Sequence, residues 1–477
     1  MTFNSIEFVI FLPLMYCLYW LLRGKTREQN ILLLIGSYIF YGWWDVRFLS
    51  LLFLSSLVDF LIGRALPAHH DTPRAKYLLY LSLAVNLGIL GVFKYYDFFV
   101  LSFQEAFASV GVHLNVHTLN VILPLGISFY TFQTLSYTID IYRKHLQPTS
   151  DFVNFFAYVS FFPQLVAGPI ERAASLLPQF ETERKFDRDL SADGLRQILW
   201  GFFKKMVIAD NIGVQVDQIF ATYPDQSAPT LFLCVLIFIV QLYTDFSGYS
   251  DIAVGTGKLF GFRLMTNFRT PAFSRSIPDF WARWHISMTS WFRDYLYKPM
   301  ASRFKTSKAM SFVTIIVLFV VIGLWHGANW TFVGYGLLNG LYFIPNVLKR
   351  QNMRVRNALR KLYSTNFLIV VVCALTFILN ALTSVFFRSP DLQSSIGYMV
   401  NLFVHPTWAA PGAPVLKAWF LYVVPFLTFE WVQRDYEHQL DIRRYPRWLR
   451  FVFYYLLILL MILFANFGKP PFIYFQF

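Results

Sequence analysis

Charged side chains are scarce in this sequence, because Asp, Glu, Lys and Arg together make up only 14% of its 477 residues. In soluble domains, charged residues make up roughly 25% of the sequence. Hydrophobic residues reach 56% and aromatic residues 19%, and a single soluble domain of this length does not build a core that could bury them. The aromatic excess suits a lipid-facing surface with aromatic belts at its interfaces. The composition therefore excludes a soluble globular protein and predicts an integral membrane protein.

Cysteine is also rare: Cys17, Cys234 and Cys373 each lie inside an apolar stretch, far from one another. Their spacing matches no disulfide or metal-binding pattern, so we expect packing residues and no metal site. The GTGK segment at 255–258 is not a phosphate-binding loop, since the spacing fails and no strand precedes it. The first apolar run, 5–22, lacks a basic leader and a cleavage site, which predicts a first span instead of a signal peptide.

Apolar runs of about 20 residues, the length that crosses a bilayer, follow one another with short connections. We expect an all-α polytopic protein that forms one transmembrane domain over residues 1–477, without internal repeats. About ten to twelve of the runs should be true spans, and the others re-entrant or horizontal helices. The candidate runs are 5–22, 29–45, 47–64, 77–99, 119–142, 152–170, 195–216, 230–254, 310–329, 330–348, 365–387, 414–432 and 450–467.

The net charge of +14 is distributed over short loops between the apolar runs. This distribution argues against nucleic-acid binding and for anchoring charge beside membrane lipids on the cytoplasmic side. Basic residues crowd 23–27, 64–76 and 349–361, whereas the loop at 101–118 has no Lys or Arg. The alternation predicts an external N-terminus.

The segment 241–339 differs from both ends, because Asp, Arg, His, Asn and Trp interrupt its apolar runs. Polar groups at membrane depth are costly unless they line a protein interior or a wet cavity. We therefore expect function to concentrate there. Its two carboxylates, Asp245 and Asp251, need partners such as the arginines downstream, which favours a structural ion-pair network, with proton handling as the alternative.

Two of the nine histidines lie in this polar segment, and the other seven lie in loops or just outside spans, where solvated surface positions are expected. His326 ends a convincing span and has glycines on either side, so it needs a polar function or a hydrogen-bonded packing partner. His285 follows Arg283 and Trp284. This alternation is typical of an interfacial helix, or of a site for an anionic ligand from the cytoplasm.

Short motifs in one order and spacing resemble the membrane-bound O-acyltransferase family, in the branch of the alginate O-acetylation membrane subunit. The motifs are SYIFYGWW at 37–44, FKY at 93–95, LPLGISFY at 123–130, FFPQLVAGPI at 161–170, DFSGYSD at 245–251, RWHIS at 283–287, LWHG at 324–327 and FIYFQF at 472–477. One departure is that 295–299 leads into Met300, Ala301, Ser302 and Arg303, where the branch often has a Gly-Gly-Asn-Arg turn. The local loop shape should differ there.

The resemblance implies about eleven spans around a central funnel or tunnel, with His326 as the catalytic histidine and His285 as a second polar histidine. His326 would act as general base or proton relay. Asn329 and the backbone near Gly327 would stabilise the oxyanion. Arg269 and Arg283, with His285, would position the donor through its phosphates.

The expected function is membrane O-acylation. A cytoplasmic thioester, acetyl-CoA, would donate an acetyl group that crosses a bacterial inner membrane to an exported polysaccharide through a periplasmic partner protein. Acetyl-CoA would be a substrate, and no cofactor would be bound permanently. The alternatives are a transporter or flippase, which often has two repeat-related halves, and a non-catalytic scaffold.

Overall fold

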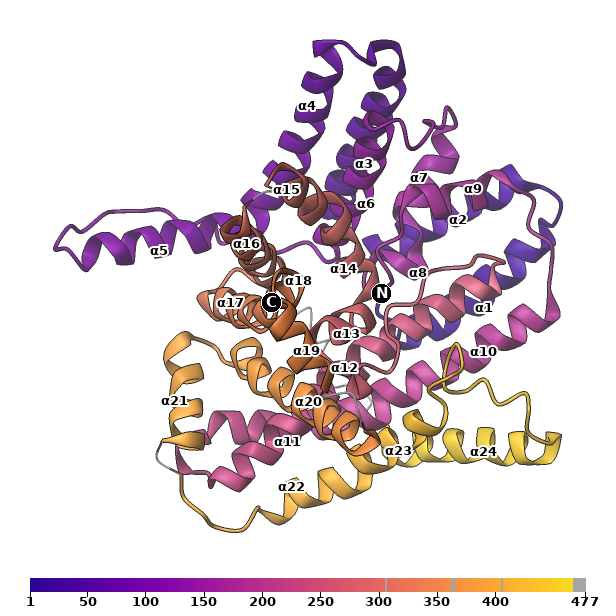
Figure 1. Ribbon diagram of the computed structural model, residues 1–477. Helices are drawn as coiled ribbons and strands as arrows, with labels where there is room; N and C mark the ends of the chain where they lie inside the picture. The colour runs from indigo at the N-terminus through magenta and orange to yellow at the C-terminus, as the bar shows by residue number, and fades with distance from the viewer. Residues whose placement is uncertain (305–306, 362–364, 405, 466–477) are drawn as a thin grey trace. The chain divides into compact units, whose positions relative to one another are not determined.

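A computed structural model describes residues 1–304, 307–361, 365–404 and 406–465, and all of its regular elements in these ranges are helices (Figure 1). The chain divides into two compact units. Unit 1 comprises Met1–Ile198 and Ile252–Met265, and unit 2 comprises Leu199–Asp251 and Thr266–Phe477. The expected single transmembrane domain stays a prediction. His405 and the FIYFQF motif at 472–477 lie outside the described residues.

Within the described ranges, unit 1 contains nine complete α-helices, the beginning of α10 and the last turns of α12 (Ala228–Leu259). The bounds are α1 Ile6–Leu21, α2 Thr26–Gly42, α3 Leu49–Ala65, α4 Pro73–Leu90, α5 Tyr96–Ala108, α6 Ile127–Tyr142, α7 Phe152–Ser160, α8 Phe162–Leu165, α9 Ala173–Glu181 and α10 Arg188–Phe202. Helix α2 packs on α7, while α3, α4 and α6 pack on one another (Figure 1).

A buried polar cluster joins α3, α4 and α6. The Asp59 carboxylate on α3 accepts hydrogen bonds from Ser82 and Asn86 on α4 and from Thr138 on α6. Asp59 and these three partners are all buried. Removing any one of them would leave a buried polar group without its hydrogen bond and would destabilise the fold. The cluster therefore ties three helices together at one place.

Short polar residues start many of the helices. Ser5, Asp151, Ser307, Thr365 and Asp391 each accept a hydrogen bond from a backbone N–H in the first turn of the following helix. Such side chains satisfy donors that have no partner inside the helix. The boundaries of these helices therefore follow from local sequence.

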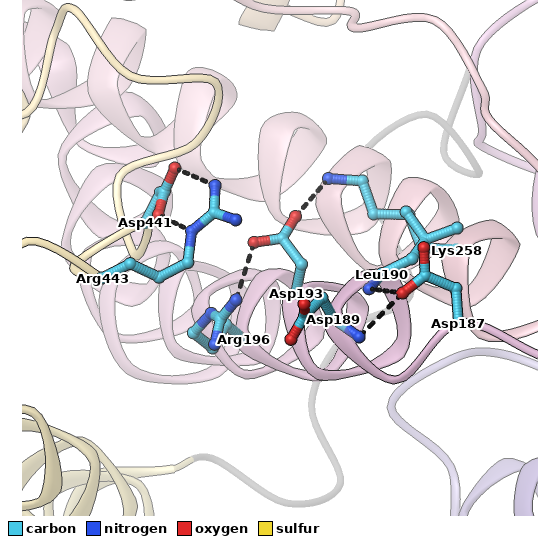
Figure 2. Close-up of polar contacts among 8 residues, drawn as sticks. All are labelled: Asp187, Asp189, Leu190, Asp193, Arg196, Lys258, Asp441 and Arg443. Carbon is cyan, nitrogen blue, oxygen red and sulfur yellow. Dashed lines mark hydrogen bonds and ion pairs between the residues drawn. The ribbon is translucent and has the colours of Figure 1, made fainter. Parts of the chain in front are cut away.

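The N-terminal end of α10 is fastened to the last turns of α12 (Ala228–Leu259) inside unit 1. Figure 2 shows the Asp193 carboxylate between Lys258 at 2.7 Å and Arg196 at 3.0 Å. A Cβ added to Gly194 would lie 2.6 Å from the carbonyl oxygen of Gly255, so these helices cross with their backbones in close approach. The GTGK segment at 255–258 thus belongs to a helix crossing, as expected for a segment that is not a phosphate loop.

Unit 2 takes up the rest of α10 and α12 and contains the helices from α11 onward. The bounds are α11 Asp210–Ala221, α13 Ile277–Arg283, α14 Ile286–Phe292, α15 Lys298–Arg303, α16 Lys308–His326, α17 Trp330–Tyr342, α18 Ile344–Gln351, α19 Met353–Lys361, α20 Asn366–Arg388, α21 Leu392–Phe403, α22 Ala413–Ala418, α23 Val424–Val432 and α24 Arg447–Phe464. Helices α16 and α17 form a tight hairpin, and α20 packs on α17. Residues 300–303, where the expected turn residues are missing, belong to α15.

Seven helices in the described ranges are long and apolar enough to cross a membrane. They are Val46–His69, Pro73–Ala108, Ala228–Leu259, Ala309–His326, Asn366–Arg388, Ala413–Val432 and Arg447–Phe464. Shorter apolar helices cover Ile6–Leu21 and Phe152–Leu165. The all-α polytopic prediction is confirmed, and the protein is a multi-pass membrane protein. The count of about eleven spans and the central tunnel stay predictions.

Some predicted spans are interrupted in the structure. The run 119–142 becomes helical only at Ile127, after Gly126 adopts a left-handed backbone with φ 73°. The run 195–216 changes from α10 to the π-helix η4 (Phe203–Ala209) and then to α11. Hydropathy averages over a window and cannot detect these changes of backbone conformation.

Candidate active site

Helices α16 and α17 hold His326 because their backbones approach closely. A Cβ on Gly323 would lie 2.1 Å from the carbonyl oxygen of Phe332, and a Cβ on Gly336 would lie 2.2 Å from that of Phe319. No side chain fits in these gaps, so the hairpin requires glycine at both positions. His326 is the last residue of α16, and extended backbone at Gly327 follows it.

His326 is only 3% exposed and is surrounded by aromatic rings. Its ring centroid lies 6.0 Å from that of Tyr335 on α17 and 5.3 Å from that of Phe387 on α20. Both rings meet the imidazole edge to face, at interplanar angles of 86° and 70°. These walls exclude water, which strengthens any polar interaction that the imidazole makes with a substrate.

His285 lies in the junction between α13 and α14 and is fully buried. Its backbone is left-handed, with φ 43° and ψ 54°, a conformation that costs free energy in a residue other than glycine. Burial lowers the pKa of His285 to about 3, so the imidazole is neutral at physiological pH. His285 therefore contributes hydrogen bonding and shape, and not positive charge.

A backbone clamp holds the junction. The carbonyl oxygen of Asn267 accepts from the N–H of Ile286 at 2.9 Å, and Asn267 Oδ1 accepts from the N–H of Ser287 at 3.3 Å. The N–H of Arg269 also donates to the carbonyl oxygen of Arg283 at 3.0 Å. These contacts on both sides of His285 maintain its left-handed backbone.

The two candidate histidines contact one indole. The ring of Trp325 lies 5.5 Å from that of His285 and 5.0 Å from that of His326. Phe246 from α12 also meets His285 edge to face at 4.6 Å. Unit 2 therefore brings α12, the α13–α14 junction and the end of α16 together around both histidines. Trp325 was not among the predicted site residues, although the adjacent His326 was a signal.

The predicted donor-binding and oxyanion residues differ in their surroundings. Arg269 is exposed, whereas Arg283 is half-buried and forms an ion pair with Asp279 at 2.8 Å. Asn329 uses both polar atoms in the fold: Oδ1 accepts from the N–H of Thr331, and Nδ2 donates to the carbonyl oxygen of Pro390. Asn329 thus caps α17, and its role at the oxyanion stays a prediction.

Asp245 and Asp251 form ion pairs with two adjacent, buried lysines. Lys205 Nζ lies 2.7 Å from both Asp245 and Asp210, and Lys204 Nζ lies 2.5 Å from Asp251. The structural role of the two aspartates, with proton handling as the alternative, stays a prediction. Neither lysine was among the predicted partners, which were arginines downstream, although two adjacent lysines inside the apolar run 195–216 were the available signal.

Comparison with known proteins identifies the family. Residues 141–387, just over half of the chain and including both histidines, match the family described as MBOAT, membrane-bound O-acyltransferase family. The chain belongs to the membrane-bound O-acyltransferase family. It is therefore an O-acyltransferase, and this membership favours an enzyme over the transporter and the scaffold.

Three relatives in this family illustrate the similarity. A probable alginate O-acetylase AlgI of Pseudomonas syringae pv. tomato is 40% identical over 396 residues, which cover 82% of this chain and 73% of that protein. A probable alginate O-acetylase AlgI of Azotobacter vinelandii is 42% identical over 344 residues, which cover 72% of this chain and 68% of that protein. A peptidoglycan O-acetyltransferase of Helicobacter pylori is 33% identical over 428 residues, which cover 83% of this chain and 78% of that protein.

Proposed function

We propose that this acyltransferase takes an acetyl group from cytoplasmic acetyl-CoA and passes it across a bacterial inner membrane for O-acetylation of an exported or cell-surface polysaccharide. A periplasmic partner protein would complete the transfer to the polysaccharide. The observation that carries the proposal is the buried His326 at the end of α16, inside the family-matched region. The names of the relatives, two probable alginate O-acetylases and a peptidoglycan O-acetyltransferase, support the acetyl group and the class of acceptor.

The chemical step requires a base at the acceptor hydroxyl. As the hydroxyl oxygen attacks the thioester carbonyl carbon, His326 accepts its proton. A C–O bond forms, the C–S bond breaks, and the proton passes from His326 to the leaving thiolate. The products are an O-acetyl ester and CoA with a free thiol, so His326 returns to its neutral form.

The donor would enter beside the α13–α14 junction. The exposed guanidinium of Arg269 suits the CoA phosphates, which Arg binds through two parallel hydrogen bonds. Arg283 already forms an ion pair with Asp279, so it would contribute less to binding the phosphates. Because His285 is neutral, its part would be to shape the channel for the uncharged arm of the donor.

The first test is transfer from radiolabelled acetyl-CoA in proteoliposomes with the partner and acceptor supplied. We expect His326→Ala to lower the rate by about 10²–10⁴-fold, the usual contribution of a general base. His438→Ala is the matched control, because His438 lies outside the family-matched range and is 2% exposed, so the expectation of a solvated surface position was wrong for this histidine. A correctly folded His326→Gln variant with the wild-type rate would contradict the assignment of the base. If the wild type releases no CoA, acetyl-CoA is the wrong donor.

A further inference from the structure

The side-chain N–H group of Asn267 and the hydroxyl of Ser287 are two buried polar groups close to His285 in the α13–α14 region. Asn267 and Ser287 are each 1% exposed. Among the described residues, neither Asn267 Nδ2 nor Ser287 Oγ has a hydrogen-bond partner. Leaving such donors unpaired in an apolar environment costs stability, so their presence requires an explanation.

The orientation of the Asn267 amide is determined by its other contact. Because Oδ1 accepts from the backbone N–H of Ser287, the Nδ2 group is the end that remains available. This bond joins the Asn267 side chain to the backbone of Ser287, so the two residues form one small cluster. The cluster lies against the junction in which His285 adopts its left-handed backbone.

The chemistry of this cluster suits a carbonyl oxygen. An amide N–H and a hydroxyl are both neutral donors, and a carbonyl oxygen has two lone pairs to accept them. Apolar rings from Phe246, Phe268 and Trp325 surround the neighbouring imidazole, and such surroundings strengthen hydrogen bonds by excluding water.

We propose that Asn267 Nδ2 and Ser287 Oγ form a donor pair that binds a carbonyl oxygen of the acyl-thioester substrate beside His285. The inference rests on the proposed function and names the part of the donor that this junction recognises. In a purely structural role, Asn267 Oδ1 would suffice to hold the α13–α14 junction, and neither unpaired donor would matter.

Ser287→Ala is the decisive variant, because it removes only the unpaired hydroxyl and leaves the backbone clamp intact. We expect an unchanged or higher thermal midpoint, since a buried unsatisfied group is removed, together with a loss of transfer of about 10²-fold. Thr314→Val on α16 is the matched control, because the Thr314 hydroxyl is also buried and has no partner among the described residues. This control should keep the wild-type rate. Asn267→Ala should lower both transfer and thermal midpoint.

Steady-state rates with acetyl-CoA distinguish the possible carbonyl groups. In Ser287→Ala, a lower kcat with unchanged KM would assign the pair to the thioester carbonyl, and a higher KM with unchanged kcat would assign it to an amide carbonyl of the donor arm. Either result supports the inference. Wild-type kcat and KM in a folded Ser287→Ala variant would overturn it, while leaving the proposed function intact. An inactive wild type would overturn both.

Discussion

Glu171, in the segment between α8 and α9, shows how burial of a single side chain sets its protonation. It is 1% exposed and accepts hydrogen bonds from Ser175 Oγ at 3.1 Å and from the N–H of Met265. Burial raises the pKa of Glu171 to about 7, against the opposing effect of these hydrogen bonds and of Arg172. The carboxyl is therefore largely protonated in the folded protein at mildly acidic pH.

This raised pKa predicts that stability depends on pH. Between the ordinary pKa of 4.5 and the raised pKa of about 7, the carboxyl is ionised in the unfolded chain and protonated in the folded one. Its contribution is fully present below pH 4.5 and is lost as the pH rises through 7, a loss of ~3 kcal/mol. At each pH we compare the thermal midpoint of the wild type with that of Glu171→Gln. We expect the midpoint of the wild type to decrease relative to that of the variant as the pH rises from about 5 to about 8.

Thermal unfolding in detergent at several pH values measures this difference. Glu181→Gln is the control, because Glu181 is an exposed carboxyl of the same unit, and its curve should run parallel to that of the wild type. If the curve of thermal midpoint against pH for Glu171→Gln also ran parallel to that of the wild type, the Glu171 carboxyl would have the same pKa in the folded and the unfolded chain, and the prediction would be wrong.

At the scale of elements, the α16–α17 hairpin determines where His326 lies. Its backbones touch at Gly323 and Gly336, three residues before the histidine and across from it. An added methyl group would collide with backbone atoms, which cannot rotate away as a flexible side chain can. The position of the His326 imidazole thus depends on two residues that carry no side chain.

Gly323→Ala should therefore separate the hairpin. We expect a loss of about 1–3 kcal/mol in stability from overpacking, together with reduced acetyl transfer because His326 moves. The control is Gly88→Ala in α4, where an added Cβ meets nothing within 4 Å. That substitution should stabilise the helix by about 0.5–1 kcal/mol. A Gly323→Ala variant with wild-type midpoint and activity would show that the helices can separate without cost.

At the scale of the whole molecule, the distribution of basic residues predicts the orientation in the membrane. Within unit 1, Lys144 forms an ion pair with Asp71 at 2.6 Å, so the loop after α6 lies beside the loop between α3 and α4. The basic segment at 64–76 is predicted to be cytoplasmic, and this contact supports the loop after α6 lying on the same side. The external N-terminus stays a prediction.

Labelling with a membrane-impermeant maleimide in intact cells tests this orientation. In a Cys17→Ser background, Ser109→Cys should react from outside, because it lies in the loop without Lys or Arg. Ala68→Cys, between α3 and α4, should react only after the membrane is opened. Both positions are exposed. The reverse pattern would place the N-terminus in the cytoplasm.

The sequence by itself determined the membrane class, the helical architecture, the polar segment at 241–339 and the two histidines that match the family motifs. These features depend on composition, run length and local motifs, which can be read along one chain. Helix starts at Ser5, Asp151 and Asp391 are equally local.

Only the tertiary structure decided which groups meet. It placed Trp325 against both histidines, paired Lys205 with Asp245 and Asp210, and joined Asp59 to α4 and α6. It also showed that His285 is buried, which lowers its pKa and keeps the imidazole neutral, and that the Asn267 amide N–H and the Ser287 hydroxyl have no hydrogen-bond partner among the described residues. Burial and pairing depend on contacts between residues far apart in sequence, and no local pattern encodes those distances.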